Sequence, residues 1–172
     1  MATARTRSPA LTSTDTVAQR AWETRSEDET RTLAAQLSHE LRAGDVIALV
    51  GPLGAGKTAF VRGLAEGLGL ADGVRVSSPS YALVNAYELA HPVRGAATLT
   101  HLDLYRIDAR EGDEALDGLG FSDLPEDAIV VVEWPERAPA ALAAATVRID
   151  FEDLGAELRR IVLSPRDDRS VG

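Results

Sequence analysis

Cysteine is absent from this chain of 172 residues, and only one of its 18 basic residues is a lysine. Without cysteine there is no disulfide, thiolate nucleophile, zinc finger or iron–sulfur ligand, so stability must come from packing. Long apolar segments are missing as well. The apolar runs at residues 46–50 and 129–132 fall far short of the ~20 residues that cross a bilayer. We therefore expect no membrane span and a cytoplasmic location.

Acidic residues outnumber basic ones and give a formal net charge of -9 at pH 7. Tight direct binding to nucleic acid normally depends on a patch of Lys and Arg that displaces counterions from the phosphates. The acidic balance of this chain opposes such binding. If a nucleic acid is involved in the function, we expect a partner protein to contact it.

One motif with a defined chemistry is complete. Residues 51–58 read GPLGAGKT, which matches G-x-x-x-x-G-K-[ST] between an apolar run and a helical pattern, the context of a phosphate-binding loop (P-loop). Backbone N–H groups of such a loop surround the β-phosphate, and the helix N-terminus adds its dipole. Lys57 would reach the β- and γ-phosphates, and Thr58 would bind Mg²⁺. The predicted nucleotide ligands in the loop are Gly51, Leu53, Gly54, Ala55, Gly56, Lys57 and Thr58.

Hydrophobic periodicity predicts the elements around this loop. Ser26 and Glu29 have the S-x-x-E spacing of a capped helix, which we expect to run until Gly44. The pattern indicates further helices at 58–70 and 111–119, strands at 45–50, 97–103 and 129–132, strand-like pieces within 74–88, and a hairpin of 147–151 with 158–163.

This order predicts an α/β chain with a three-layer P-loop NTPase fold, whose sheet is mainly parallel with an antiparallel edge hairpin. The length fits one domain. We assign residues 26–165 to the P-loop ATPase domain, residues 1–25 to a disordered N-terminal extension, and residues 166–172 to a flexible C-terminal tail.

Two acidic residues follow predicted strands directly. Glu133 comes after the run at 129–132, and Asp103 ends the strand at 97–103. A P-loop enzyme needs a carboxylate at the end of a neighbouring strand to order Mg²⁺ and to orient the attacking group. We therefore predict Glu133, Asp103 and Lys57 as catalytic residues, and Thr58, Glu133 and Asp103 as metal ligands.

The nucleotide is predicted by elimination. A Ras-type GTPase reads guanine with Asn-Lys-x-Asp, and a chain whose only lysine is Lys57 cannot contain that motif. The serine- and glycine-rich signature of ABC ATPases is missing, and the chain is short for a RecA- or AAA-type module. We therefore expect ATP, with Mg²⁺, as the ligand.

Four segments together resemble one family. Residues 53–58 (LGAGKT), 78–81 (SPSY), 101–106 (HLDLYR) and 132–134 (VEW) occur in an order that is similar to the bacterial TsaE family. That family is the ATPase subunit of the machinery that makes threonylcarbamoyladenosine (t⁶A) in tRNA. The resemblance runs from about residue 26 to residue 163, and the blocks at 101–106 and 132–134 are far more specific than the P-loop alone.

The resemblance implies an ATPase that binds the TsaB and TsaD proteins and resets that pair by ATP turnover. The product would be t⁶A at adenosine 37 of tRNAs reading codons that start with A, with tRNA contacted only through the complex. Residues 78–81, including Ser80, would sense the γ-phosphate. Adenine would lie between Ser26 and Thr30 on one side and Arg159 or Arg160 on the other.

Other residues keep more than one interpretation. Trp134 would pack near the nucleotide, at the partner face, or in an ordinary structural role, and His101 could pack the strand that carries Asp103. His39 and His91 are expected to be surface residues. No arginine finger is identifiable, so we expect turnover to be slow until a partner completes the site.

Two other function classes remain open. A small-molecule kinase would use Asp103 or Glu133 to deprotonate a substrate hydroxyl, but such kinases usually carry an Arg-rich lid, and only Arg106 and Arg110 lie near the predicted site. A nucleotide-gated assembly module would bind ATP with negligible hydrolysis. Loss of partner turnover in Glu133→Ala with ATP binding retained would favour the ATPase over the gating module.

Overall fold

The computed structural model describes residues 19–79 and 81–165. The predicted extension up to residue 18, the predicted tail at 166–172 and the predicted γ-phosphate sensor Ser80 lie outside the described residues. Within them, no helix is long and apolar enough to cross a membrane.

A seven-stranded sheet with the strand order β1-β7-β6-β2-β5-β4-β3 forms the centre of the molecule. Its middle strands are parallel, because β2 pairs in parallel with β5 and β6, and β5 pairs in parallel with β4. Antiparallel pairs flank this centre on both sides. The strands are β1 (Arg20–Thr24), β2 (Val46–Val50), β3 (Val84–Val93), β4 (Ala96–Asp103), β5 (Ala128–Glu133), β6 (Val147–Gly155) and β7 (Leu158–Pro165).

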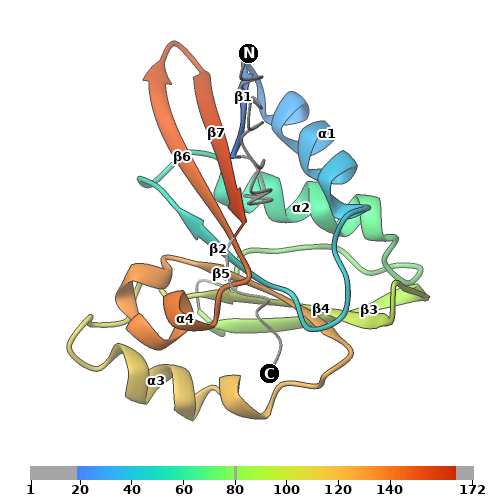
Figure 1. Ribbon diagram of the computed structural model, residues 1–172, viewed down its shortest axis with the longest axis vertical. Coiled ribbons are helices and arrows are strands. Elements are labelled where there is room, and N and C mark those ends of the chain that lie inside the picture. Colours follow the sequence, from blue (N-terminus) through green and yellow to red (C-terminus); the bar gives the residue numbers. More distant parts are fainter. Residues whose placement is uncertain (1–18, 80, 166–172) are drawn as a thin grey trace, which may run out of the picture.

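Helices cover both faces of the sheet, which confirms the predicted three layers (Figure 1). Strand β5 shows the division, since Ile129 and Val131 pack into one core cluster while Val130 and Val132 pack into the other. The first cluster lies under α1 (Glu27–Ser38) and α2 (Lys57–Leu68), and the second under α3 (Gly112–Gly118) and α4 (Pro139–Ala144). Two short 3₁₀ helices, η1 (Phe121–Asp123) and η2 (Pro135–Arg137), complete the described elements.

Two glycines bring α1 and α2 into close contact. A Cβ atom added at Gly63 would lie 2.7 Å from the Cβ atom of Ala34, and one added at Gly67 would lie 2.8 Å from the Cα atom of Ala35. Both positions are one helical turn apart on α2, so they form one flat strip against α1. This contact fixes α2, and with it the P-loop at its N-terminus, against the rest of the fold.

The expected start of the domain at residue 26 is wrong, because β1 precedes it. Arg20 to Thr24 pair with β7, and the Thr24 hydroxyl bonds to that of Thr30 in α1 at 2.8 Å. The hairpin of β6 and β7 is therefore antiparallel as predicted, but it is not the edge, since β1 covers β7. A strand of five residues with exposed positions on one face has too weak an apolar alternation to stand out in the sequence.

Other differences concern element ends and short elements. The first helix ends at Ser38 with His39 as its cap, and Gly44 lies in the following turn. Strand β3 is longer than the pieces expected within 74–88, and it pairs antiparallel with β4. Helix α4 was not predicted, because its run of alanines around one leucine carries almost no amphipathic pattern.

Candidate nucleotide-binding site

The P-loop connects β2 to α2, as predicted. Gly54 and Gly56 have φ angles of 78° and 98°, a region that L side chains rarely adopt. A Cβ atom at Gly51 would lie 2.8 Å from the backbone oxygen of Phe151 in β6, so only glycine fits there. These three positions allow the backbone to curl tightly before α2 begins at Lys57.

Lys57 is almost completely buried in this loop, with 4% of its surface exposed. Its ammonium donates hydrogen bonds to the carbonyl oxygens of Gly51 (2.6 Å) and Pro52 (2.9 Å). Burial lowers the pKa of Lys57, and the nearby carboxylates, with Glu133 the strongest, partly oppose this shift. The Lys57 ammonium is thus a compact cation whose two partners are neutral carbonyl oxygens, which an anionic ligand could replace.

Trp134 covers the Lys57 ammonium. The Lys57 Nζ atom lies 4.0 Å from the centre of the Trp134 ring, within the range of a cation–π contact. The Trp134 backbone has a φ of 59°, so the chain turns sharply where β5 ends, and the Tyr105 ring packs against the indole at 5.0 Å. Of the interpretations left open, a place beside the phosphate loop is the one that the structure supports.

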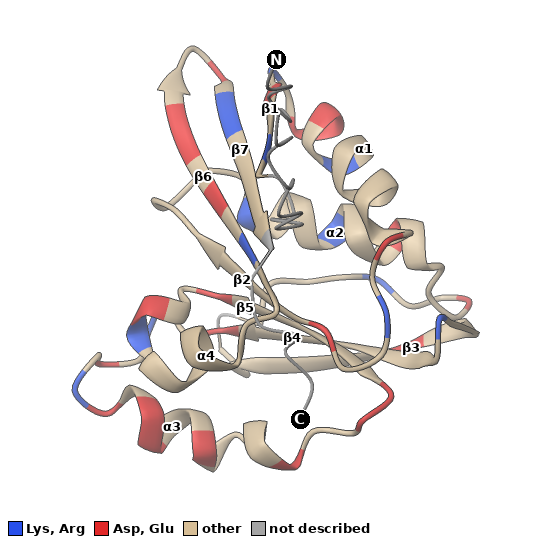
Figure 2. Cartoon of the chain, viewed as in Figure 1, with Lys and Arg blue, Asp and Glu red and all other residues tan. Residues whose placement is uncertain are grey.

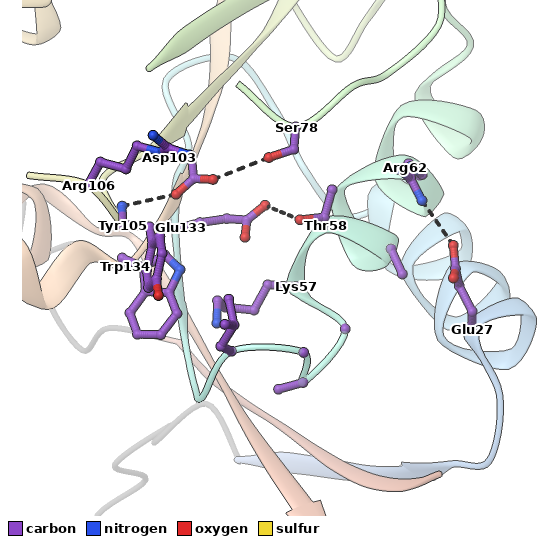
Figure 3. A pocket seen from close by; sticks show the side chains of 15 residues that line it. Glu27, Lys57, Thr58, Arg62, Ser78, Asp103, Tyr105, Arg106, Glu133 and Trp134 are labelled. Carbon is purple, nitrogen blue, oxygen red and sulfur yellow. Dashed lines mark hydrogen bonds and ion pairs between the residues drawn. The ribbon is translucent and has the colours of Figure 1, made fainter. Parts of the chain in front are cut away.

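Glu133 and Asp103 lie side by side at the carboxyl edge of the sheet, because β4 and β5 pair with these two residues in register. Both are buried. The Thr58 hydroxyl donates to Glu133 Oε1 at 2.9 Å, which joins the P-loop to β5. Asp103 accepts hydrogen bonds from the Ser78 hydroxyl (3.3 Å) and the Tyr105 backbone N–H (3.0 Å) (Figure 3).

These groups border a cleft of about 350 Å³, a size within the range of small-molecule sites. Its lining includes the P-loop from Leu53 to Thr58, both carboxylates, and the side chains of Ser78, Arg106 and Trp134. One ammonium and a turn of backbone N–H groups therefore face two carboxylates across the same space. This arrangement combines anion binding with cation binding, as a nucleoside triphosphate with its metal ion requires.

The donor set also fits Mg²⁺. A hydroxyl and two carboxylates are the hard oxygen ligands that Mg²⁺ prefers, and it usually takes its remaining ligands from phosphates and water. Among the described residues, no group of three or more His, Cys, Asp or Glu residues gathers into a metal cage. Such a site suits a metal ion that arrives with a phosphate ligand.

The predicted adenine contacts are only partly brought together. Thr30 and Arg159 border the loop, since a Cβ atom at Gly56 would lie 3.8 Å from Thr30 Cγ2 and 3.4 Å from Arg159 Cδ. Ser26 instead caps α1 by accepting from the Glu29 N–H. Within the described residues, Arg160 is neither among the nearest neighbours of the P-loop glycines nor part of the cleft lining. It pairs in register with Glu152 and Glu23, and its guanidinium forms an ion pair with Glu152 at 3.9 Å.

Two contacts in this region were not predicted. His101 is buried on the strand of Asp103, as expected, and it also bonds through Nε2 to Glu133 Oε1 at 2.9 Å. Arg106 lies over the exposed ring of Tyr81, with its guanidinium carbon 4.4 Å from the ring centre. His101 and Asp103 are two residues apart on β4, so their side chains lie on one face of the sheet. A single sequence does not show which strand pairs with β4, so the contact of His101 with Glu133 could not be predicted. His39 and His91 are exposed, as expected.

Comparison with known proteins then identifies the family. The family model described as "Threonylcarbamoyl adenosine biosynthesis protein TsaE" matches residues 24–161. The chain belongs to the TsaE family. Relatives named tRNA threonylcarbamoyladenosine biosynthesis protein TsaE include those of Mycobacterium bovis (34% identical, 78% of this chain and 79% of the relative), Streptomyces coelicolor (33%, 81% and 92%) and Bacillus subtilis (30%, 86% and 87%).

A solved structure supports the same conclusion. The crystal structure of Bacillus subtilis YdiB is similar to this chain with a TM-score of 0.61 and 27% identity, and the match covers 86% of each chain. The TsaE match begins in β1 and ends in β7. It therefore spans the P-loop and the ends of β4 and β5, where the cleft lies.

Proposed function

We propose that this TsaE-family chain is an ATPase that binds and hydrolyses ATP with Mg²⁺ and acts on the TsaB and TsaD proteins in the formation of t⁶A at adenosine 37 of tRNA. The observation that carries the proposal is the bond between Thr58 and Glu133. It connects the phosphate-binding loop to a carboxylate on the neighbouring strand, and Lys57 lies across the same cleft. P-loop ATPases depend on this combination.

Each residue then has a role that follows from its contacts. The loop N–H groups and Lys57 bind the phosphates, and Lys57 exchanges the Gly51 and Pro52 carbonyls for phosphate oxygens. Thr58 and Glu133 hold Mg²⁺, which supplies charge neutralisation when bound. Asp103 is the residue that orients water. Asp103 accepts a hydrogen bond from Ser78, which lies in the segment after α2. Through this bond, a change at the γ-phosphate that moves Asp103 would also move the segment around Ser78.

The distribution of charge supports an indirect relation to tRNA. Acidic residues are spread over α3, β6 and the start of α1 (Figure 2), and they are consistent with the net charge of -9. Such a surface repels a polyanion, whereas a partner protein can bring the tRNA to the complex. The names of the relatives refer to t⁶A synthesis in tRNA. We therefore place this chain in the cytoplasm, beside partners that hold the tRNA.

The first test measures ATP binding by calorimetry and phosphate release in the presence of Mg²⁺. Lys57→Ala removes the only ammonium in the cleft, and we expect it to weaken ATP binding by at least about 100-fold, since charge-assisted bonds to phosphate contribute ~1.5–3 kcal/mol each. Glu133→Ala should keep ATP binding and lose hydrolysis. His91→Ala, an exposed position on β3, is the control and should change neither. Wild-type ATP affinity in Lys57→Ala would refute the phosphate site.

A further inference from the structure

His101 is the one histidine in the described part of the chain that is completely buried, with 0% of its surface exposed. It lies on β4, on the side of the sheet that α1 and α2 cover, since Leu99 and Leu102 on that strand belong to different core clusters. Its neighbours on this face include the apolar Leu99 and, on β5, Val131. A polar ring in such surroundings lowers stability unless it makes a hydrogen bond.

The one hydrogen bond of the His101 ring in the described structure goes to Glu133. Its Nε2 atom lies 2.9 Å from Glu133 Oε1, while Nδ1 is buried and has no hydrogen-bond partner among the described residues. A carboxylate only accepts hydrogen bonds, so Nε2 must carry the proton. A proton on Nδ1 would leave a buried donor without an acceptor. The geometry therefore favours the neutral ring with a proton on Nε2, which donates to Glu133.

The same carboxylate oxygen accepts from Thr58. Glu133 Oε1 thus receives two hydrogen bonds, one from His101 behind it and one from the Thr58 hydroxyl in front, both of 2.9 Å. The second oxygen of Glu133 points into the cleft on the side of Lys57 (Figure 3). Because the Thr58 proton points to Glu133, the lone pairs of the Thr58 oxygen are left to face the cleft.

We propose that His101 is a positioning residue that fixes the Glu133 carboxylate, and through it the Thr58 hydroxyl, in the orientation that holds Mg²⁺. This rests on the proposed function, because it assigns a role to His101 in the same metal site. The physical reason is general: groups that bond to metal ligands set ligand orientation, and their loss usually lowers metal affinity or activity about 10–100-fold.

Three variants test the proposal. His101→Leu fills the space without a donor, His101→Gln places an amide N–H near the Nε2 position, and His101→Asn carries an amide too short to reach Glu133. Leu99→Ala is the matched control, since it perturbs packing on the same face of β4 without touching Glu133. Calorimetry measures binding of a non-hydrolysable ATP analogue with Mg²⁺ and with a chelator, thermal unfolding gives Tm, and phosphate release gives kcat and KM.

We expect His101→Leu to bind the analogue as the wild type does in chelator and to lose about 10–100-fold of Mg²⁺ affinity. At saturating ATP and low Mg²⁺ its kcat should fall, and raising the Mg²⁺ concentration should recover part of the loss. His101→Gln should recover most of both, and His101→Asn should not, which keeps the comparison valid if His101→Leu does not fold. Leu99→Ala should lower Tm and leave Mg²⁺ affinity unchanged.

Failure of the positioning role and failure of the proposed function would give different results. Wild-type Mg²⁺ affinity and kcat in folded His101→Leu or His101→Asn would overturn the positioning role and leave the proposed ATPase standing. Analogue binding that is insensitive to Mg²⁺ in the wild-type chain itself would overturn the proposed function and the positioning role together.

Discussion

Lys57 combines two properties that are in physical opposition. It is buried, which disfavours its charge, yet it is the only lysine in a chain whose other Lys and Arg positions are all arginine. A compact ammonium fits beneath the Trp134 ring and between two loop carbonyls, whereas a planar guanidinium needs more room. Burial at this position lowers the pKa of Lys57, and the lowered pKa should make nucleotide binding depend on pH.

As pH rises, nucleotide affinity should begin to fall at a lower pH than it would if Lys57 had the pKa of an ordinary lysine. In the free protein the pKa of Lys57 lies below its usual 10.5 because of burial, and bound phosphates would raise it. Between these two values binding takes up a proton, so affinity decreases as pH rises, by at most about tenfold per pH unit. The test is to measure the Kd of a non-hydrolysable ATP analogue at a series of pH values from neutral toward 10.5, the usual pKa of lysine.

Lys57→Arg separates this effect from general alkaline damage. A guanidinium stays charged over the same range, so this variant should bind more weakly at every pH but without the alkaline decline. An equal decline in Lys57→Arg and the wild type would show that another group causes it.

At the scale of elements, β7 presents its two adjacent arginines to opposite sides of the sheet. Arg159 lies opposite Thr24 and borders the P-loop at Gly56, whereas Arg160 lies opposite Glu23 and Glu152. The period of two along a strand makes this division unavoidable. We therefore expect Arg159, and not Arg160, to contact a nucleotide in the loop.

The two arginines therefore form a matched pair of variants. Arg159→Ala should weaken binding of the ATP analogue by about fivefold, the size of a solvent-accessible charge contact. Arg160→Ala should leave affinity unchanged, because it loses only its exposed ion pair with Glu152. Calorimetry on both variants decides the assignment. A larger loss in Arg160→Ala than in Arg159→Ala would contradict the register of β7.

These arginines show where prediction from the sequence ends. Motif spacing and strand-end position predicted Lys57, Thr58, Glu133 and Asp103 as site residues from local pattern alone, and all four line one cleft in the structure. The face of β7 that meets the P-loop depends instead on the pairing of β7 with β1 and β6. His101 depends likewise on the register between β4 and β5. Strand β1 was missed because long-range pairing, not local pattern, forms it.

At the scale of the whole molecule, the sheet and its two helical layers bring the loop between β2 and α2 to the ends of β4 and β5. The fold thus brings the proposed phosphate-binding and metal-binding groups to one cleft. The cleft lining includes two arginines: Arg62, which forms an exposed ion pair with Glu27, and Arg106, which lies over the solvent-exposed ring of Tyr81. Because both arginines are held by exposed contacts, we expect the proposed ATPase to turn over slowly until a partner binds.

The most direct test of this account is phosphate release from ATP by the chain alone and after mixing with purified TsaB and TsaD proteins from the same source. We expect slow release by the chain alone, a rise of at least about tenfold on mixing, and loss of that rise in Glu133→Ala with ATP binding retained. Release that is unchanged on mixing, or a rise that survives in Glu133→Ala, would contradict a partner-activated ATPase centred on Glu133.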